Sequence, residues 1–112
     1  MILYHNPRCG KSREAFKILI EKGESPKIRE YLKEVPTADE IEELLTILGI
    51  DAVDLVRTSE QIYKDEYKHK KMSKVAWIEA MIEHPKLIQR PILIANGKAI
   101  IGRPPERILD IL

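Results

Sequence analysis

MILYHNPRCGKS, residues 1–12, decides the fold and contains the only cysteine of the chain, Cys9. Residues 1–5 form a short apolar run that Asn6-Pro7 stops, which predicts a buried first strand. The apolar residues of 11–22 then recur at helical spacing, ahead of a glycine that is typical of a helix end. Cys9 is therefore predicted to lie in a strand-to-helix loop, just ahead of a helix N-terminus.

A second strand and a block of helices are predicted downstream. Residues 26–31 alternate enough to form a short or edge strand. Thr37-Ala38-Asp39-Glu40 is a capping box, in which the Thr37 hydroxyl accepts from the amide of Glu40, so a helix is expected from there to a glycine stop at position 49. Asp51 and Ser73 can cap two further helices, the second ending near residue 84.

The chain closes with a β-hairpin and a short helix. Asn96-Gly97 separates two apolar runs, 92–95 and 98–101, and this dipeptide favours a type I′ hairpin turn. Residues 106–112 return to helical spacing. A strand-helix-strand unit favours a parallel pair to which the hairpin adds antiparallel strands. We therefore expect an α/β protein with a thioredoxin-like fold, a four-stranded mixed sheet flanked by helices, as one domain over 1–112. A helical insertion is expected at about 37–85, between strands 2 and 3.

Composition excludes several classes of protein. With 19 Lys and Arg against 18 Asp and Glu, the net charge of +1 provides no general field for nucleic acid or an anionic membrane. No stretch is long and apolar enough for a signal peptide or a membrane span, so we expect a cytoplasmic protein. We also expect a monomer. A single cysteine excludes internal disulfides and zinc ribbons, and no histidine pair has metal-ligand spacing, so no metal is expected.

The cysteine loop is locally basic. Four potentially cationic side chains and no acid occur between residues 5 and 13: His5, Arg8, Lys11 and Arg13. Unpaired amides and the positive end of a helix dipole favour a thiolate at Cys9, and the same groups bind tetrahedral oxyanions. We expect Arg8, Gly10, Lys11 and Ser12 to contribute to such an anion site. The alternative is a small buried cysteine, which is the usual fate of a free one, although Arg8 and Gly10 make a poor core environment.

Ser12 leaves two interpretations open. Cys9-Gly10-Lys11-Ser12 is a Cys-x-x-Cys pattern with serine in the second place. The Ser12 hydroxyl can hydrogen-bond a thiolate, or it can simply cap the helix. In neither case can Ser12 resolve a mixed disulfide, so a reductive cycle needs a thiol from another molecule.

Three motifs carry a resemblance to a known family. Tyr4-His5-Asn6-Pro7-Arg8-Cys9-Gly10-Lys11-Ser12-Arg13, Leu87-Ile88-Gln89-Arg90-Pro91-Ile92 and Gly102-Arg103-Pro104-Pro105-Glu106 resemble the glutaredoxin-coupled arsenate reductases, the ArsC family. The resemblance implies a thioredoxin-like fold with a helical insertion. It also implies a cysteine thiolate that attacks arsenate and three arginines that hold the oxyanion. By position these are Cys9 and the arginines Arg57, Arg90 and Arg103.

The resemblance also assigns lesser roles. His5 matches a histidine that helps to lower the thiol pKa, and Pro91 matches a proline near the thiol whose peptide bond is usually cis. His5 and the three arginines each have a simpler interpretation, since a lone histidine is more often structural and most arginines are solvated surface charges. The implied substrate is arsenate or a similar oxyanion. The resemblance also implies glutathione as the co-substrate and glutaredoxin as the protein partner, and we expect no bound cofactor.

Two rival functions remain. One is a glutathione-dependent thiol or disulfide reductase of the same family with a substrate other than arsenate. The other is a regulator similar to the Spx proteins, which bind RNA polymerase. Ser12 argues against the regulator, because those proteins typically have a Cys-x-x-Cys redox switch. The Lys68-His69-Lys70-Lys71 run also departs from the family's more acidic and apolar segment, which leaves the partner contacts of this region open.

Overall fold

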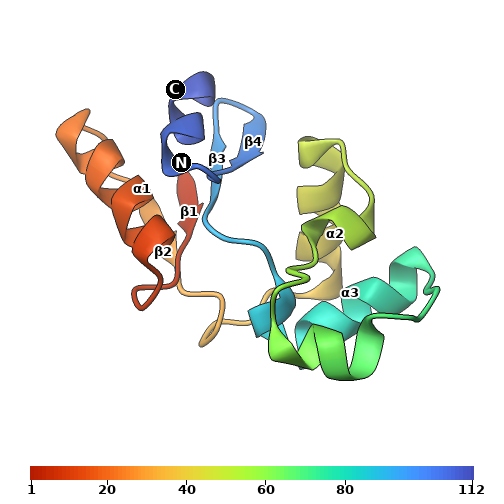
Figure 1. Cartoon of the computed structure of the whole chain (residues 1–112). Coiled ribbons are helices and arrows are strands. Elements are labelled where there is room, and N and C mark those ends of the chain that lie inside the picture. Colours follow the sequence, from red (N-terminus) through yellow and green to blue (C-terminus); the bar gives the residue numbers. More distant parts are fainter. The chain divides into compact units, whose positions relative to one another are not determined.

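Four short strands form one mixed sheet in the order β2-β1-β3-β4 (Figure 1). The computed structural model describes residues 1–112. The strands are β1 (Ile2–Tyr4), β2 (Lys27–Arg29), β3 (Ile92–Ala95) and β4 (Lys98–Ile101). β1 is parallel to β2 and antiparallel to β3, and β3 is antiparallel to β4. The expected four-stranded mixed sheet is thus confirmed, with β2 as an edge strand.

Sequence signals for caps and turns agree with the local geometry. Asn96 and Gly97 have φ values of 56° and 72°, as a type I′ turn requires. The Thr37 hydroxyl accepts from the amide of Glu40, whose carboxylate accepts from the amide of Thr37, so the capping box is complete. Ser73 accepts from the amide three residues on and caps a later helix. The α-helices are α1 (Gly10–Glu21), α2 (Ala38–Leu48) and α3 (Lys74–Glu83).

Shorter helical turns complete the chain. The closing segment, expected as a helix, is a 3-10 helix, in which side chains three residues apart align. One π-helical turn, which the sequence did not predict, lies between residues 58 and 72, ahead of α3. These turns are the 3-10 helices η1 (Ala52–Leu55), η3 (Pro85–Leu87) and η4 (Pro105–Ile111) and the π-helical turn η2 (Tyr63–Tyr67).

The chain divides into two compact units. The sheet unit consists of residues 1–34 and 90–112 and contains all four strands, α1 and η4. The helical unit consists of residues 35–89 and contains α2, α3 and the other helical turns. The insertion expected at about 37–85 falls inside the helical unit. The organisation of the chain as a single domain stays a prediction.

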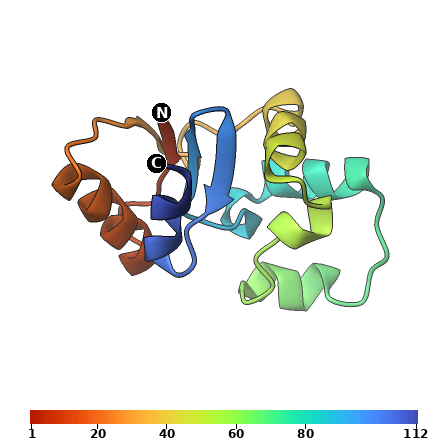
Figure 2. The same ribbon diagram turned by 90° about the horizontal axis from the view of Figure 1, so that it is seen from above.

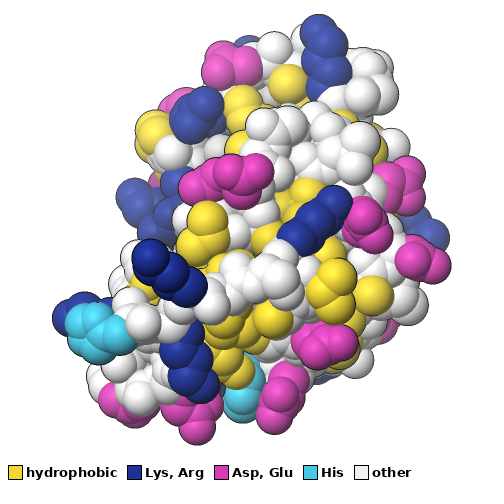
Figure 3. Space-filling model, turned by 90° about the vertical axis from the view of Figure 1, so that its right-hand side faces the viewer, with side chains coloured by type: hydrophobic (Ala, Val, Ile, Leu, Met, Phe, Trp, Pro, Cys, Tyr) yellow, Lys and Arg dark blue, Asp and Glu magenta, His cyan; other side chains and the backbone are white.

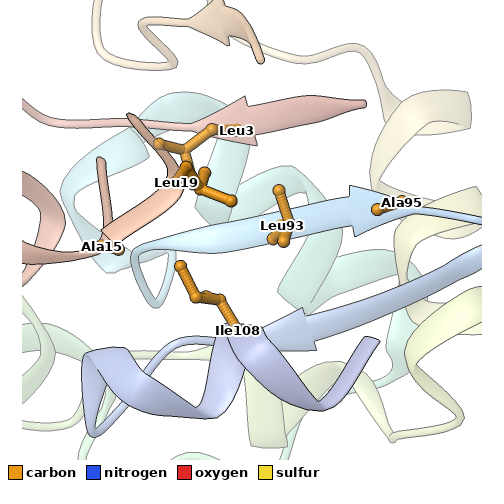
Figure 4. Close-up of a cluster of buried hydrophobic side chains, with 6 residues drawn as sticks. All are labelled: Leu3, Ala15, Leu19, Leu93, Ala95 and Ile108. Atoms are coloured by element: carbon orange, nitrogen blue, oxygen red, sulfur yellow. The ribbon is translucent and has the colours of Figure 1, made fainter. Parts of the chain in front are cut away.

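The core of the sheet unit lies between the sheet and two helices. Leu3 of β1 and Leu93 of β3 are paired in register and are fully buried. Leu19 of α1 and Ile108 of η4 pack into the same cluster, together with two alanines (Figure 4). α1 and η4 therefore cover one face of the sheet, and Figure 2 shows them side by side. This packing fixes the start of α1, and with it Cys9.

The helical unit has its own interior. The rings of Tyr63 and Tyr67 lie against that of Trp77, at centroid distances of 6.4 Å and 5.8 Å. An isolated antiparallel bridge joins Val56 to Ile88. In the space-filling view, positive and negative side chains are scattered around apolar ones on the face shown (Figure 3). No helix of the chain combines the length and the apolar character needed to cross a membrane.

Candidate active site

The loop that carries Cys9 is held in shape by its own hydrogen bonds. The Asn6 side-chain oxygen accepts from the amide of Arg8 at 3.0 Å, and the Asn6 carbonyl accepts from the amide of Cys9 at 2.9 Å. The Arg13 guanidinium reaches back to the Pro7 carbonyl at 3.1 Å. Cys9 is the N-cap of α1, as predicted, with extended backbone and no side-chain cap of its own. The thiol is thus placed at the open N-terminal end of the helix.

The surroundings of the Cys9 thiol favour its ionised form. Burial alone raises the pKa of the thiol, but the backbone amide of Ser12, the charge of Arg90, the amide of Lys11 and a hydrogen bond from Arg90 together outweigh it. The pKa of Cys9 is consequently below its usual value. The thiol is also partly exposed, which a nucleophile that meets an external substrate requires. The interpretation of Cys9 as an inert core residue does not fit this environment.

Two of the three predicted arginines lie together at the end of the hairpin. Arg90 lies two residues before β3, is only 9% exposed and interacts with the Cys9 thiol. The Arg103 guanidinium, just after β4, donates to the Arg90 carbonyl at 3.1 Å. The Arg90–Pro91 peptide is cis, as the resemblance implied, and the Pro91 carbonyl accepts from the amide of Gly102 at 2.8 Å. Thiol, Arg90, Pro91 and Arg103 therefore belong to one constellation within the sheet unit.

The Ser12 hydroxyl neither caps the helix nor bonds the thiolate, which were the two interpretations of the sequence. Ser12 is fully buried inside α1, and its hydroxyl accepts from the amide of Asn6 at 3.0 Å. The same oxygen lies 2.6 Å from Nδ1 of His5. The expectation that Ser12 caps the helix is wrong, because a third-position serine points back along the helix toward the loop. Its backbone amide, rather than its hydroxyl, is the group that stabilises the thiolate.

His5 is a buried part of this network, and its surroundings lower its pKa. Burial lowers the pKa of His5, the Glu30 carboxylate raises it and the Arg13 charge lowers it, with a net result below the usual value. The Ser12 hydroxyl accepts a hydrogen bond from the Asn6 amide and can donate one to Nδ1 of His5. This arrangement requires the His5 tautomer that is protonated on Nε2. The ring also stacks on Phe16 at 5.6 Å. His5 thus reaches the cysteine loop through Ser12, and its part in catalysis stays a prediction.

Arg57 lies in the helical unit. Its amide donates to the Leu87 carbonyl, and its guanidinium pairs with Glu60 at 2.9 Å. The Arg57 side chain is about one quarter exposed, and its buried Nε has no hydrogen-bond partner. Arg57 therefore keeps one donor without a hydrogen bond, and this donor is buried in the structure. Its place beside the thiol stays a prediction.

The remaining predicted residues line the loop and the first turn of the helix. Gly10 and Lys11 are exposed at the start of α1, and Arg8 is exposed in the loop. Sequence reasoning missed the bracing roles of Asn6 and Arg13 and the effect of Glu30 on His5. The Asn-Pro turn signal was the one clue to Asn6, because asparagine side chains commonly accept from an amide two residues on. No group of three or more His, Cys, Asp and Glu residues is arranged to hold a metal ion.

Comparisons with known proteins show the family of the chain and agree with its fold. The model of the ArsC family matches residues 4–111. "Uncharacterized protein YfgD" of Escherichia coli K12 is 46% identical over 98% of this chain and 94% of its own. An "Arsenate reductase" of Haemophilus influenzae is 42% identical over the whole of this chain and 98% of its own. The structure named "Arsenate reductase from Vibrio cholerae" superposes with a TM-score of 0.94 at 42% identity, over 99% of this chain and 96% of that one.

Proposed function

Because the chain belongs to the ArsC family, we propose that it reduces arsenate to arsenite through a covalent intermediate on Cys9. The observation that supports this best is the joint position of the thiol and its donors. The Cys9 sulfur interacts with the amides of Ser12 and Lys11 and with the Arg90 guanidinium, and these groups lower the pKa of the thiol. Hydrogen-bond donors that stabilise a thiolate also stabilise an oxyanion that binds next to it.

The first step forms a sulfur–arsenic bond. The Cys9 thiolate attacks the arsenic of arsenate, and one arsenic-bound hydroxyl departs, taking up a proton to leave as water. Arg90 and Arg103 hold the negative oxygens as charge develops, and Arg57 is the third arginine assigned to this task. Arsenic stays in its pentavalent state in this step, so no electrons have yet been supplied.

Electrons come from two thiols of other molecules, because Cys9 is the only cysteine in the chain. The thiol of glutathione displaces a second oxygen as water and forms another sulfur–arsenic bond. A glutaredoxin thiolate then attacks the glutathione sulfur, and the electron pair of the broken bond reduces arsenic to the trivalent state. Water replaces Cys9 on arsenic and releases arsenite. We expect the enzyme to act as a monomer without a bound cofactor in the cytoplasm, where glutathione keeps thiols reduced.

A coupled assay tests this proposal. Arsenate-dependent NADPH oxidation is measured with glutathione, glutaredoxin and glutathione reductase present. We expect turnover with the native protein and none above background with Cys9→Ser. Turnover that survives Cys9→Ser would refute covalent catalysis on this thiol.

The rival function is a glutathione-dependent disulfide reductase of the same fold, and the partly exposed thiol is the observation that keeps it open. The Arg103→Ala variant separates the two, because Arg103 binds no part of a neutral disulfide. Loss of arsenate turnover with retained reduction of a model mixed disulfide supports the arsenate reductase. Disulfide reduction by a native protein that has no arsenate turnover supports the rival.

A further inference from the structure

A cleft of about 290 Å³ lies beside the cysteine loop within the sheet unit. Residues 5–8 of the loop form one side, and Glu30, Leu32 and Lys33 form the other. Its volume lies just below the usual range for small-molecule sites, about 300–1,000 Å³. We propose that this cleft binds glutathione and presents its thiol to Cys9. The inference rests on the function proposed above and adds the place where the co-substrate binds.

The charges of the cleft match those of the tripeptide. Arg8 and Lys33 supply two cations, and Glu30 supplies one carboxylate. Glutathione has two carboxylates and one ammonium at neutral pH, which is the complementary set. The Lys33 and Glu30 side chains are 3.9 Å apart, and they are 80% and 38% exposed, so solvent weakens their mutual pairing and both can turn to a ligand.

The presence of Glu30 argues against arsenate as the occupant. A carboxylate repels a small anion that carries no positive group, whereas it pairs with the ammonium of a zwitterion. Leu32, which is 38% exposed, and Pro7 add apolar surface that a bare oxyanion would not use. The cleft therefore suits a charged peptide better than it suits the oxyanion. Arg8, which the sequence assigned to the oxyanion, binds a glutathione carboxylate under this proposal.

The position of the cleft suits delivery of a thiol. Arg8 lines the cleft and is followed directly by Cys9, and consecutive Cα atoms are only about 3.8 Å apart. The hydrogen bond from the Cys9 amide to the Asn6 carbonyl keeps this part of the loop tightly turned. Cys9 does not itself line the cleft, so the proposal requires a tripeptide along residues 6–8 to extend its central cysteine past Arg8 to the thiol.

A binding experiment tests the cleft without any turnover. S-methylglutathione, which has the charges of glutathione but no free thiol, is titrated into the native protein while backbone amide NMR signals are followed. We expect saturable shifts of the amides of 6–8 and 30–33, and no comparable shifts with S-methylcysteine, which lacks the flanking residues. Absence of shifts at these amides would overturn the proposal.

A kinetic experiment uses a matched pair of lysines. Lys33 pairs with Glu30 at 3.9 Å and is 80% exposed, and Lys17 of α1 pairs with Glu21 at 3.9 Å and is 78% exposed. In the coupled assay, Lys33→Gln should raise the KM for glutathione about threefold to fivefold and leave the KM for arsenate unchanged. Lys17→Gln should change neither. If the two variants behave alike, Lys33 does not bind glutathione and the cleft is refuted.

The two arms separate failure of the cleft from failure of the proposed function. Shifts of the cleft amides in a protein without arsenate turnover refute the arsenate reductase and support the cleft. Turnover that depends on Cys9, without such shifts and with equal Lys33 and Lys17 variants, refutes the cleft and supports the arsenate reductase.

Discussion

Ser12→Ala is the substitution that tests the interior of the cysteine loop most directly. The Ser12 hydroxyl is fully buried and has two partners, Nδ1 of His5 at 2.6 Å and the amide of Asn6 at 3.0 Å. Alanine removes this oxygen and leaves the backbone of α1 in place. The buried His5 ring and the partly buried Asn6 amide would then both lose this hydrogen bond.

The expected cost follows from these two orphaned groups. An unsatisfied buried donor or acceptor costs about 1–3 kcal/mol, and Asn6 is only partly buried, so we expect a loss of about 2–4 kcal/mol in the free energy of unfolding. For a protein of 112 residues this corresponds to a fall in Tm of roughly 8–16 °C. The Ser12 amide still addresses the Cys9 sulfur, so the thiol pKa should stay below its usual value.

Urea unfolding followed by circular dichroism measures the loss, and absorbance of the thiolate near 240 nm measures the pKa. Cys9 is the only thiol that contributes to this titration, because the chain has no other cysteine, and the four tyrosines, which also absorb there when ionised, ionise at a higher pH of about 10. Ser73→Ala is the matched control, since it removes a helix cap worth about 1 kcal/mol and does not touch the loop. A change below about 0.5 kcal/mol for Ser12→Ala would refute the buried network. A thiol pKa that returned to its usual value would show that the hydroxyl, not the amide, stabilises the thiolate.

Three further predictions concern the same region. Arg90→Gln should raise the pKa of the Cys9 thiol, because it removes a charge that lowers this pKa; an unchanged absorbance titration would contradict that assignment. Burial lowers the pKa of His5 below its unfolded value of about 6.5, so the unfolded state binds the proton more readily. The contribution of His5 to stability is therefore complete above a pH of about 6.5 and is lost as the pH falls toward the folded pKa. Urea unfolding at several pH values should show this slope, and a His5→Gln variant with the same slope would exclude His5 as its source. In Gly102→Ala the new methyl would lie 3.0 Å from the Pro91 ring, so we expect a loss of about 1–3 kcal/mol in unfolding free energy by the same method, and a neutral result would show that the ring can move aside.

The sequence predicted those features whose causes are local. The type I′ turn at Asn96-Gly97, the Thr37 capping box and the position of Cys9 ahead of a helix each depend on a few consecutive residues, and all three are confirmed. Ser12 shows where local reasoning stops. Its buried partner His5 is seven residues away across a loop, and only the folded path of that loop brings the two side chains together.

The convergence of the site depends on strand pairing, which sequence patterns specify only in part. The hairpin register pairs Ile92 with Ile101, so the residues just before β3 and just after β4 are neighbours; this alone places Arg90 beside Arg103. The hairpin pattern in the sequence is therefore sufficient to place Arg90 and Arg103 close together. The meeting of Arg90 with Cys9 needs a second pairing.

That second pairing is the antiparallel register between β1 and β3. Tyr4 lies opposite Ile92, so the chain that leaves β1 toward Cys9 runs beside the chain that enters β3 from Arg90. No local signal selects β3 rather than β4 as the neighbour of β1. The choice follows from burial: β3 is almost wholly buried and belongs in the centre of the sheet, whereas β4 is only partly buried and fits an edge. The apolar run 92–95 thus does more than form a strand, because its burial in the sheet centre brings a guanidinium to the thiol.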